Sequence, residues 1–558
     1  MSDSHRVTSI AVPEFVTVII AKVVSEFHSS ITLIQRLPGG SLIIRYIRSS
    51  YKNDPIRSLF ELALALLALY YFFSSRYSQS EQEMIKLSNR DVDELVDDWI
   101  PEPLVPPIGD NERWQVDSIP VTKGGISGRI TLLTPQGTEL KNVMNLSSRD
   151  YLSMSTNKLV AENCKAVINN SGVGACGPPN FYGTQDVHVR FQEDIAGFLG
   201  AEEGIIYGQD FATHSSVLPA FLKRGDIAVV DGGVSVALQK AVLISRCSIE
   251  WYNHNDMDHL EQVLDSLKEE LSEGPITRRF IVTEGLFDNF GDSPDLAKIV
   301  ELKNKYKFRL CLDETNSIGV LGPNGRGLPE QYGIPRSMID VTIGSMALAL
   351  GSSGGFCVGC TAMIQHQVLS SNAYVFSAAL PPYCAKAAST VLKLLEQDPK
   401  PLTKLQSNCQ YVHDLFSKTR ELSKFVTVVS KPYSPALHLR ISPAIREALE
   451  LPESYGGPGS KIAKAVKQGK EEDYFDELYN RESYLLQKII DSVLEHGILI
   501  SRSKRILHHE ILPIVPELIV SITNEFSKDE LKKAFAVINK AIIGHLKDLN
   551  LDEFDSLI

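Results

Sequence analysis

Two stretches of this 558-residue sequence carry residues suited to chemistry on a small molecule. Asp313 ends an apolar run in the phrase RLCLDETNSIGVLG. A carboxylate at the end of a buried strand can hold the protonated ring nitrogen of a cofactor, although it can also simply close the strand and cap a turn. The second stretch, GVGACGPPNFYG at 172–183, is rich in glycine, which allows close approach of the backbone to a ligand or another chain.

Seven short apolar runs provide the elements that must position these residues. They lie at 204–208, 227–231, 249–253, 279–284, 308–314, 340–345 and 354–359. Helical patterns such as 259–271 and 295–306 separate most of them, which predicts an α/β domain with a central, mainly parallel sheet. Ligands of such sheets gather where strands end, and Asp313 stands at such an end.

The glycine-rich stretch precedes a predicted helix. Phe191, Ile195, Phe198 and Leu199 fall on one face of that helix, and Gly200 follows as its expected end.

Composition indicates a folded protein, with 43% hydrophobic and 22% charged residues. A net charge of −12 argues against non-specific binding of nucleic acid. The eight cysteines are scattered, which is typical of reduced, cytosol-facing thiols rather than a disulfide framework. Cys357 and Cys360 form a lone CxxC pair without a second pair, so we expect no metal or redox site.

The first 90 residues differ from the rest of the chain. The run at 59–73 is apolar apart from one glutamate, and with its flanks it predicts a membrane span over about 57–75. Arg57 and Arg76 can then reach the two interfaces. The alternative is a buried core helix, but no neighbouring helical pattern offers a core. The run lies too far from the start for a cleaved signal peptide. The arginines before the span favour a cytosolic amino terminus.

Weaker features flank this span. An apolar stretch at 15–24 and SLIIRYI at 41–47 are suited to lying flat on a membrane surface. A short acidic helix ends near Trp99, and the proline-rich run at 101–107 predicts a stiff linker. We therefore divide the chain into a membrane-anchoring segment (1–90), a linker and arm (91–150), a large domain (151–400) and a small C-terminal domain (401–558) with a mobile insertion at about 444–482.

Two glycine-containing motifs give the chain a family resemblance. The pattern DEAHSxGxxGxxGRG is matched by Asp313, Glu314, Ser317, Gly319, Gly322, Gly325, Arg326 and Gly327. The pattern Thr/Ser-Phe-Thr/Ser-Lys-x-x-Gly-x-x-Gly-Gly is matched by Ser345, Gly351, Gly354 and Gly355. In these motifs the chain resembles the α-oxoamine synthases, fold-type I enzymes that use pyridoxal phosphate (PLP) to condense an amino acid with an acyl-CoA. The resemblance implies a seven-stranded sheet with helices on both faces and a smaller α+β domain.

The lysine of the second motif is missing. Its position is Leu348, and no lysine occurs anywhere from 308 to 385. The motif glycines on one side and Asp340 with Gly344 on the other fix this register. Without an ε-amino group there is neither a covalent link to the cofactor nor a base to move a proton. The resemblance therefore implies no catalytic residue in this chain and a vestigial cofactor site that retains Asp313 and Ser345.

Other residues that bind the cofactor or substrate in the family are also replaced in this chain. The histidine that stacks on the cofactor ring in the family falls at Ser235, and the histidine of DEAH falls at Asn316. The pair that binds the cofactor phosphate reads Asp210-Phe211, which places a repulsive carboxylate beside a phosphate. The arginine that holds the substrate carboxylate falls near Ile519. Together these changes predict that the site is abandoned.

Within the family, the phrases GVGACGPPNFYGTQDVH (172–188) and NHNDM resemble a branch of lysine-less subunits. These are the long-chain-base subunits of serine palmitoyltransferase in their fungal form, and the resemblance covers about 90–540. It implies a required, non-catalytic subunit whose lysine-bearing partner binds PLP covalently. The pair would condense L-serine with palmitoyl-CoA to 3-ketosphinganine, the first step of sphingolipid synthesis.

The resemblance also implies a location and further partners. It implies the endoplasmic reticulum membrane, with the bulk of the chain in the cytosol and the amino terminus in the lumen, against the charge rule above. A small activating subunit and Orm-type regulators are the further partners it implies. We follow the resemblance on orientation, because the body must reach serine and acyl-CoA.

Active sites in this family lie at the dimer interface, so this chain can contribute to its partner's site. We expect the glycine-rich loop to line that site through Gly174, Cys176, Phe181 and Tyr182. The alternative is a tight loop packed only on its own chain. Ser352 and Ser353 either reach the partner's PLP phosphate or serve only as turn residues. Two rival functions are a self-sufficient acyltransferase, which Leu348 opposes, and a scaffold that only anchors or regulates its partner.

Overall fold

The computed structural model describes residues 40–74, 88–100, 107–274, 276–457, 476–510 and 512–558. The chain forms two compact units, Met1–Pro106 and Pro107–Ile558. The predicted apolar stretch at 15–24 and residues 101–106 of the predicted linker lie outside the described residues.

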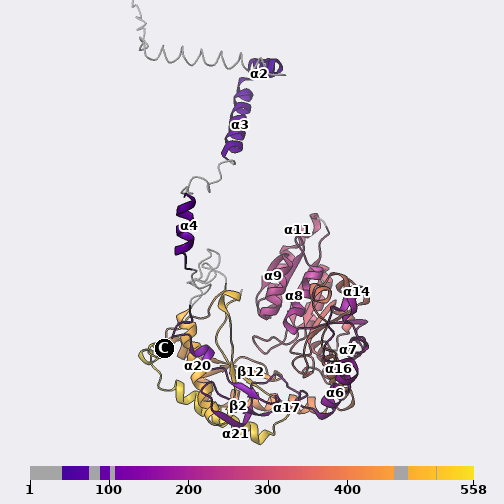
Figure 1. The fold of residues 1–558 in the computed structure, drawn as a ribbon, viewed down its shortest axis with the longest axis vertical. Coiled ribbons are helices and arrows are strands. Elements are labelled where there is room, and N and C mark those ends of the chain that lie inside the picture. The colour runs from indigo at the N-terminus through magenta and orange to yellow at the C-terminus, as the bar shows by residue number, and fades with distance from the viewer. Residues whose placement is uncertain (1–39, 75–87, 101–106, 275, 458–475, 511) are drawn as a thin grey trace, which may run out of the picture. The chain divides into compact units, whose positions relative to one another are not determined.

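The described part of the first unit consists of helices α2 (Gly40–Asn53), α3 (Pro55–Ser74) and α4 (Asn89–Asp98) (Figure 1). Within the described residues, Pro55–Phe72 is the one helical stretch long and apolar enough to cross a membrane, and none of it is buried in protein. Helix α4 is the predicted acidic helix, and it begins with a capping box made by Ser88 and Asp91.

A seven-stranded sheet forms the centre of the second unit, in the order β4-β10-β9-β8-β7-β5-β6. Its strands are β4 (Glu203–Tyr207), β5 (Ile227–Asp231), β6 (Ser248–Tyr252), β7 (Arg279–Glu284), β8 (Arg309–Asp313), β9 (Val341–Ser345) and β10 (Gly355–Gly359). All seven predicted apolar runs are therefore strands. Strand β10 is antiparallel to both neighbours, because the short loop after β9 leaves no room for a crossover helix. The other pairs are parallel.

Helices cover both faces of this sheet. Helices α6 (Lys158–Ser171), α7 (Asp186–Leu199) and α16 (Pro382–Gln397) pack on one face, and α8 (Asp210–Phe221) and α9 (Val236–Ser245) pack on the other (Figure 1). Successive side chains of β5 alternate between the two cores, with Val229 in the first and Val230 in the second. The prediction for α7 is confirmed, since its four apolar residues are buried and left-handed Gly200 ends it.

Further helices connect and extend this layer structure. They are α5 (Trp114–Asp117), α10 (Met257–Ser266), α11 (Lys268–Glu273), α12 (Leu296–Tyr306), α13 (Leu328–Tyr332), α14 (Thr361–Ser370), α15 (Asn372–Phe376) and α22 (Leu551–Asp555).

The C-terminal region combines helices with a second sheet. Helices α17 (Lys400–Lys418), α20 (Glu477–Glu495) and α21 (Lys528–Leu546) accompany the order β11-β12-β15-β14, made by Val426–Val428, Ala436–Ile441, Leu518–Ser521 and Ser501–Arg502. A third sheet joins β1 (Val121–Lys123), β2 (Arg129–Leu133) and β3 (Glu139–Asn145) to β13 (Ile498–Leu499). The predicted arm of 91–150 thus contributes strands that pair with the C-terminal region.

The two described ends of the predicted mobile insertion at 444–482 are packed. The first end of the segment forms helix α18 (Pro443–Ala448), and its last residues form the start of α20. Arg446 and Glu482 form a buried ion pair between them, and the Tyr455 hydroxyl donates a 2.7 Å hydrogen bond to Glu482. The prediction extended too far because its many charged residues suggested a solvated surface. Residues 458–475 lie outside the described residues.

Candidate vestigial cofactor site

The loop between β9 and β10 fixes the position of Leu348. The Gly351 N–H donates to the Leu348 carbonyl at 2.9 Å, and the Ser352 N–H donates to the Met346 carbonyl at 2.9 Å. Gly351 has φ +58°, and a Cβ there would lie 2.7 Å from the backbone nitrogen of Ser155. A side chain at 351 would therefore disturb the loop. Leu348 is half-buried at the bend of this constrained loop.

Asp313, at the end of β8, is already paired inside the chain. The Nε2 atom of His214, from α8, donates a 2.7 Å hydrogen bond to its Oδ2 atom. The Thr315 N–H donates to the other carboxylate oxygen at 2.9 Å. Burial disfavours a charged imidazole, but the carboxylates of Asp313 and its neighbours outweigh this effect and raise the pKa of His214. Asp313 and His214 are only 4% and 3% exposed.

Asp210 occupies the first turn of the same helix. Burial raises the pKa of its carboxyl group, although a hydrogen bond with the Ser345 side chain opposes this. Its Oδ1 atom is buried without a hydrogen-bond partner. A helix N-terminus is otherwise a favourable place for phosphate, so a carboxylate here removes that advantage.

The other positions at which the family binds cofactor or substrate carry no side chain here that could take over that role. The Ser235 N–H donates to Glu284 at 2.5 Å, and burial raises the pKa of Glu284 to about 8. Asn316 is buried, and Ile519 is buried in β15. Leu348 supplies no amine, Asp313 is occupied and Asp210 opposes phosphate. The residues of this site do not fit PLP.

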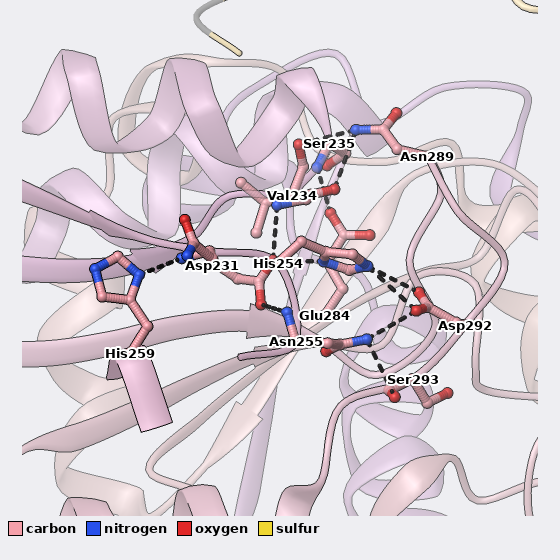
Figure 2. Close-up of polar contacts among 12 residues, drawn as sticks. Asp231, Val234, Ser235, His254, Asn255, His259, Glu284, Asn289, Asp292 and Ser293 are labelled. Carbon is pink, nitrogen blue, oxygen red and sulfur yellow. Dashed lines mark hydrogen bonds and ion pairs between the residues drawn. The ribbon is translucent and has the colours of Figure 1, made fainter. Parts of the chain in front are cut away.

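A histidine held between two carboxylates, which sequence reasoning missed, lies at the end of β5 and β6 (Figure 2). The His254 Nδ1 atom donates a 2.7 Å hydrogen bond to Asp231, and Nε2 lies 3.2 Å from both carboxylate oxygens of Asp292. Its ring stacks on Phe290, with centroids 4.1 Å apart. Burial disfavours the imidazolium, but hydrogen bonds to the two carboxylates raise the pKa of His254 to about 9. His254 therefore ties three segments of the sheet together.

The Gly172–Gly183 stretch is not entirely a loop, because Pro179–Gly183 forms one turn of π-helix. A Cβ at Gly183 would lie 1.9 Å from the Gly177 carbonyl oxygen, so the stretch folds tightly on itself. Gly174 has open space around it. Cys176 is exposed and has φ +56°, a strained conformation for a residue with a side chain.

Large apolar side chains project outward from this turn and from the neighbouring α14 and α15. Phe181 and Tyr182 are 68% and 77% exposed, and Leu369 and Phe376 are 79% and 75% exposed. The Asn180 side chain donates to the Val368 carbonyl and joins the turn to α14. We call the set Phe181, Tyr182, Leu369 and Phe376 the apolar patch. Exposed apolar side chains that gather in this way often mark an interaction site.

The two serines of the β9–β10 loop differ. The Ser352 hydroxyl donates to the Cys384 carbonyl at 2.8 Å, and its N–H donates to the Met346 carbonyl. Both donors of Ser352 are therefore used within the chain, which favours the turn-residue interpretation. Ser353 is exposed. A cavity of about 380 Å³ lies beside Ser352, and Arg149 on its wall forms a 2.5 Å ion pair with Asp288.

Comparisons with known proteins identify the relatives of this chain. A sequence model of the family described as aminotransferase class I and II matches residues 141–448. The chain is 40% identical to serine palmitoyltransferase 1 of Saccharomyces cerevisiae, over 97% of this chain and 98% of that protein. It is 33% identical to serine palmitoyltransferase 1 of Dictyostelium discoideum, over 89% and 96% of the two chains.

A solved structure supports the same fold. Serine palmitoyltransferase from S. paucimobilis, with a bound PLP–myriocin aldimine, superposes with a TM-score of 0.63 at 18% identity. The match covers 78% of this chain and 96% of that one. At this identity the likeness establishes the fold of the second unit, with its central sheet and covering helices.

Proposed function

Because this chain belongs to the serine palmitoyltransferase 1 family and has the class I and II aminotransferase fold, we propose that it is a required, non-catalytic subunit of serine palmitoyltransferase. The pair that it forms condenses L-serine with palmitoyl-CoA to 3-ketosphinganine, the first step of sphingolipid synthesis. A lysine-bearing partner holds PLP covalently. One observation carries this proposal: the loop that should present the lysine holds Leu348 in a fixed conformation.

The apolar patch supports a partner subunit. Four large apolar side chains with more than two thirds of their surface exposed gain from burial at roughly 25 cal/mol per Å². Aromatic residues such as Phe181 and Tyr182 are also the kind that dominate interfaces. In the proposed pair, strained Cys176 and open Gly174 lie beside this surface and line the partner's site.

Helix α3 supports a membrane location. Its twenty residues rise about 30 Å at 1.5 Å each, the thickness of a hydrocarbon core. In the proposed arrangement the helix anchors the enzyme in the endoplasmic reticulum membrane, with the amino terminus in the lumen and the second unit in the cytosol. A small activating subunit and Orm-type regulators bind the assembled pair.

The test compares the chain alone with the chain bound to its lysine-bearing partner. Serine-dependent release of free CoA from palmitoyl-CoA measures condensation, and borohydride followed by peptide mass spectrometry locates covalently bound PLP. We expect activity and label only in the pair, with the label on the partner. A partner whose lysine is replaced by alanine is the matched control and should abolish both signals. Condensation by this chain alone would overturn the proposal.

A second experiment separates a shared active site from pure scaffolding. Cys176→Trp should change the pair's relative rates with serine and alanine, because a bulky side chain then enters the partner's site. Cys176→Ser, which is close in size, should leave that ratio unchanged, and Cys360→Trp controls for a bulky residue at another exposed cysteine. An unchanged ratio in Cys176→Trp would favour the scaffold function.

A further inference from the structure

Helix α8 presents two groups to the end of strand β8. Asp210 and His214 are four residues apart, so they lie on the same face of the helix, one turn after the other. His214 contacts Asp313 at 2.7 Å, and Asp210 interacts with the Ser345 side chain at the end of β9. One helix face therefore covers both residues that the chain retains from a cofactor site.

The contact between His214 and Asp313 leaves the carboxylate no free oxygen. His214 holds one oxygen and the Thr315 N–H holds the other. Both side chains are almost completely buried, and a buried carboxylate is costly without a partner. His214 therefore neutralises Asp313 from within the chain, in the role that the ring nitrogen of a bound cofactor would otherwise fill.

We propose that His214 is a barrier to PLP that acts independently of Leu348, because it occupies the one carboxylate able to hold the cofactor ring. The proposal rests on the proposed function in one respect, the correspondence of Asp313 to the family's cofactor carboxylate. For a ring to reach Asp313, His214 must give up its hydrogen bond. Its Nδ1 atom already has no partner, so the displaced imidazole would be a buried polar ring without any hydrogen bond.

The barrier determines which substitutions can restore PLP binding. Restoring the amine with Leu348→Lys should not restore PLP binding, because Asp313 stays occupied. Adding His214→Asn exchanges the imidazole for a shorter, neutral side chain and frees the carboxylate to pair with a cofactor. We expect the double variant to bind PLP at least tenfold more tightly than the single variant.

The experiment uses the complete pair, purified with its partner. Each preparation is titrated with PLP, reduced with borohydride and digested, and mass spectrometry quantifies the pyridoxyl group on the lysine introduced at position 348. Variants are Leu348→Lys, Leu348→Lys with His214→Asn, and Leu348→Lys with His366→Asn. His366 is a matched control because its Nε2 atom bonds the backbone carbonyl of Ala220, at the opposite end of α8 from Asp210, and not the Asp313 carboxylate. His214→Asn alone controls for labelling elsewhere.

The expected result is at least tenfold more labelling in the Leu348→Lys, His214→Asn variant than in Leu348→Lys alone. Asp210 remains in both variants, so its repulsion of the phosphate does not affect the comparison. Equal labelling of the single Leu348→Lys variant would overturn the proposal, as would an absence of labelling in the double variant. His214→Ala replaces His214→Asn if the latter does not assemble, which size-exclusion chromatography detects. Label on the partner's own lysine and condensation by the wild-type pair are measured in parallel. Their loss would refute the proposed function rather than the role of His214.

Discussion

The Nδ1 atom of His254 donates a 2.7 Å hydrogen bond to Asp231, a carboxylate with no exposed surface. On the opposite side of the ring, Asp292 accepts from Nε2 at 3.2 Å, so both ring nitrogens carry protons and the imidazole is charged (Figure 2). Asn255 donates to the same Asp292 carboxylate at 2.8 Å. A charged histidine thus joins the end of β5 to the segment after β7.

This pair predicts that stability falls at alkaline pH. The pKa of His254 is raised to about 9 in the folded chain, against about 6.5 in an unfolded one. A raised histidine pKa gives stabilisation that is complete below pH 6.5 and is lost as the pH rises through about 9. We expect the melting temperature to fall across that window in both proteins, because Glu284 with its pKa of about 8 remains in each, but to fall more steeply in the wild type than in His254→Asn. His496→Asn, at an exposed histidine, is the control.

Melting curves recorded at several pH values by differential scanning fluorimetry measure this effect. If the wild type and His254→Asn lost stability in parallel between pH 6.5 and 9, the decline would belong to other groups.

The sheet was predictable because most of its strands can be recognised from a few neighbouring residues in the sequence. Six of the seven strands are short apolar runs that are mostly buried on both faces, which leaves a pattern readable without any partner, whereas the edge strand β6 is partly exposed. The loop around Leu348 was predictable for a similar reason, since Gly351 and Gly354 mark turns that need positive φ.

The contacts inside the site were not predictable. His214 and Asp313 are 99 residues apart, and no spacing rule connects them. His254 lies within the phrase NHNDM, but its two carboxylate partners come from the end of β5 and from the segment after β7. The many charged residues at 444–482 led to the prediction of a mobile surface insertion, but two of them, Arg446 and Glu482, form a buried ion pair. Tertiary pairing of polar groups depends on the finished fold, which apolar periodicity does not describe.

The Arg446–Glu482 pair predicts a large loss of stability when only one partner is removed. Burial raises the pKa of Glu482 to about 7, although Arg446 opposes this, so the carboxylate depends on its partner. Arg446→Met should lower the free energy of unfolding by about 3–5 kcal/mol, because it leaves a buried carboxylate unpaired. The double variant with Glu482→Gln should recover part of this loss. Urea unfolding of the purified chain measures both, and additive losses would contradict the coupling.

The apolar patch predicts weaker association when its aromatic residues are removed. Phe181→Ser combined with Tyr182→Ser should raise the dissociation constant of the pair at least tenfold, since buried aromatic anchors often contribute about 2 kcal/mol or more each. The melting temperature of the isolated chain should not change, because both side chains are exposed. Ile276→Ser, at another exposed apolar residue, is the matched control. Equal affinities by biolayer interferometry would remove the patch from the interface.

Helix α3 predicts that membrane attachment depends on its middle and not on its ends. Leu62→Arg and Leu66→Arg place charges near the centre of the helix, where each costs about 2.5–3.5 kcal/mol in a bilayer. Together they should move the chain from the carbonate-resistant membrane pellet to the soluble fraction. Ile56→Arg is the control, because an arginine at the first turn of the helix can extend to the interface. The fractionation is done on the chain without its partner, since a membrane-bound partner would retain it. A charged double variant that stays in the pellet as firmly as Ile56→Arg would show that α3 is not what holds the chain in the membrane.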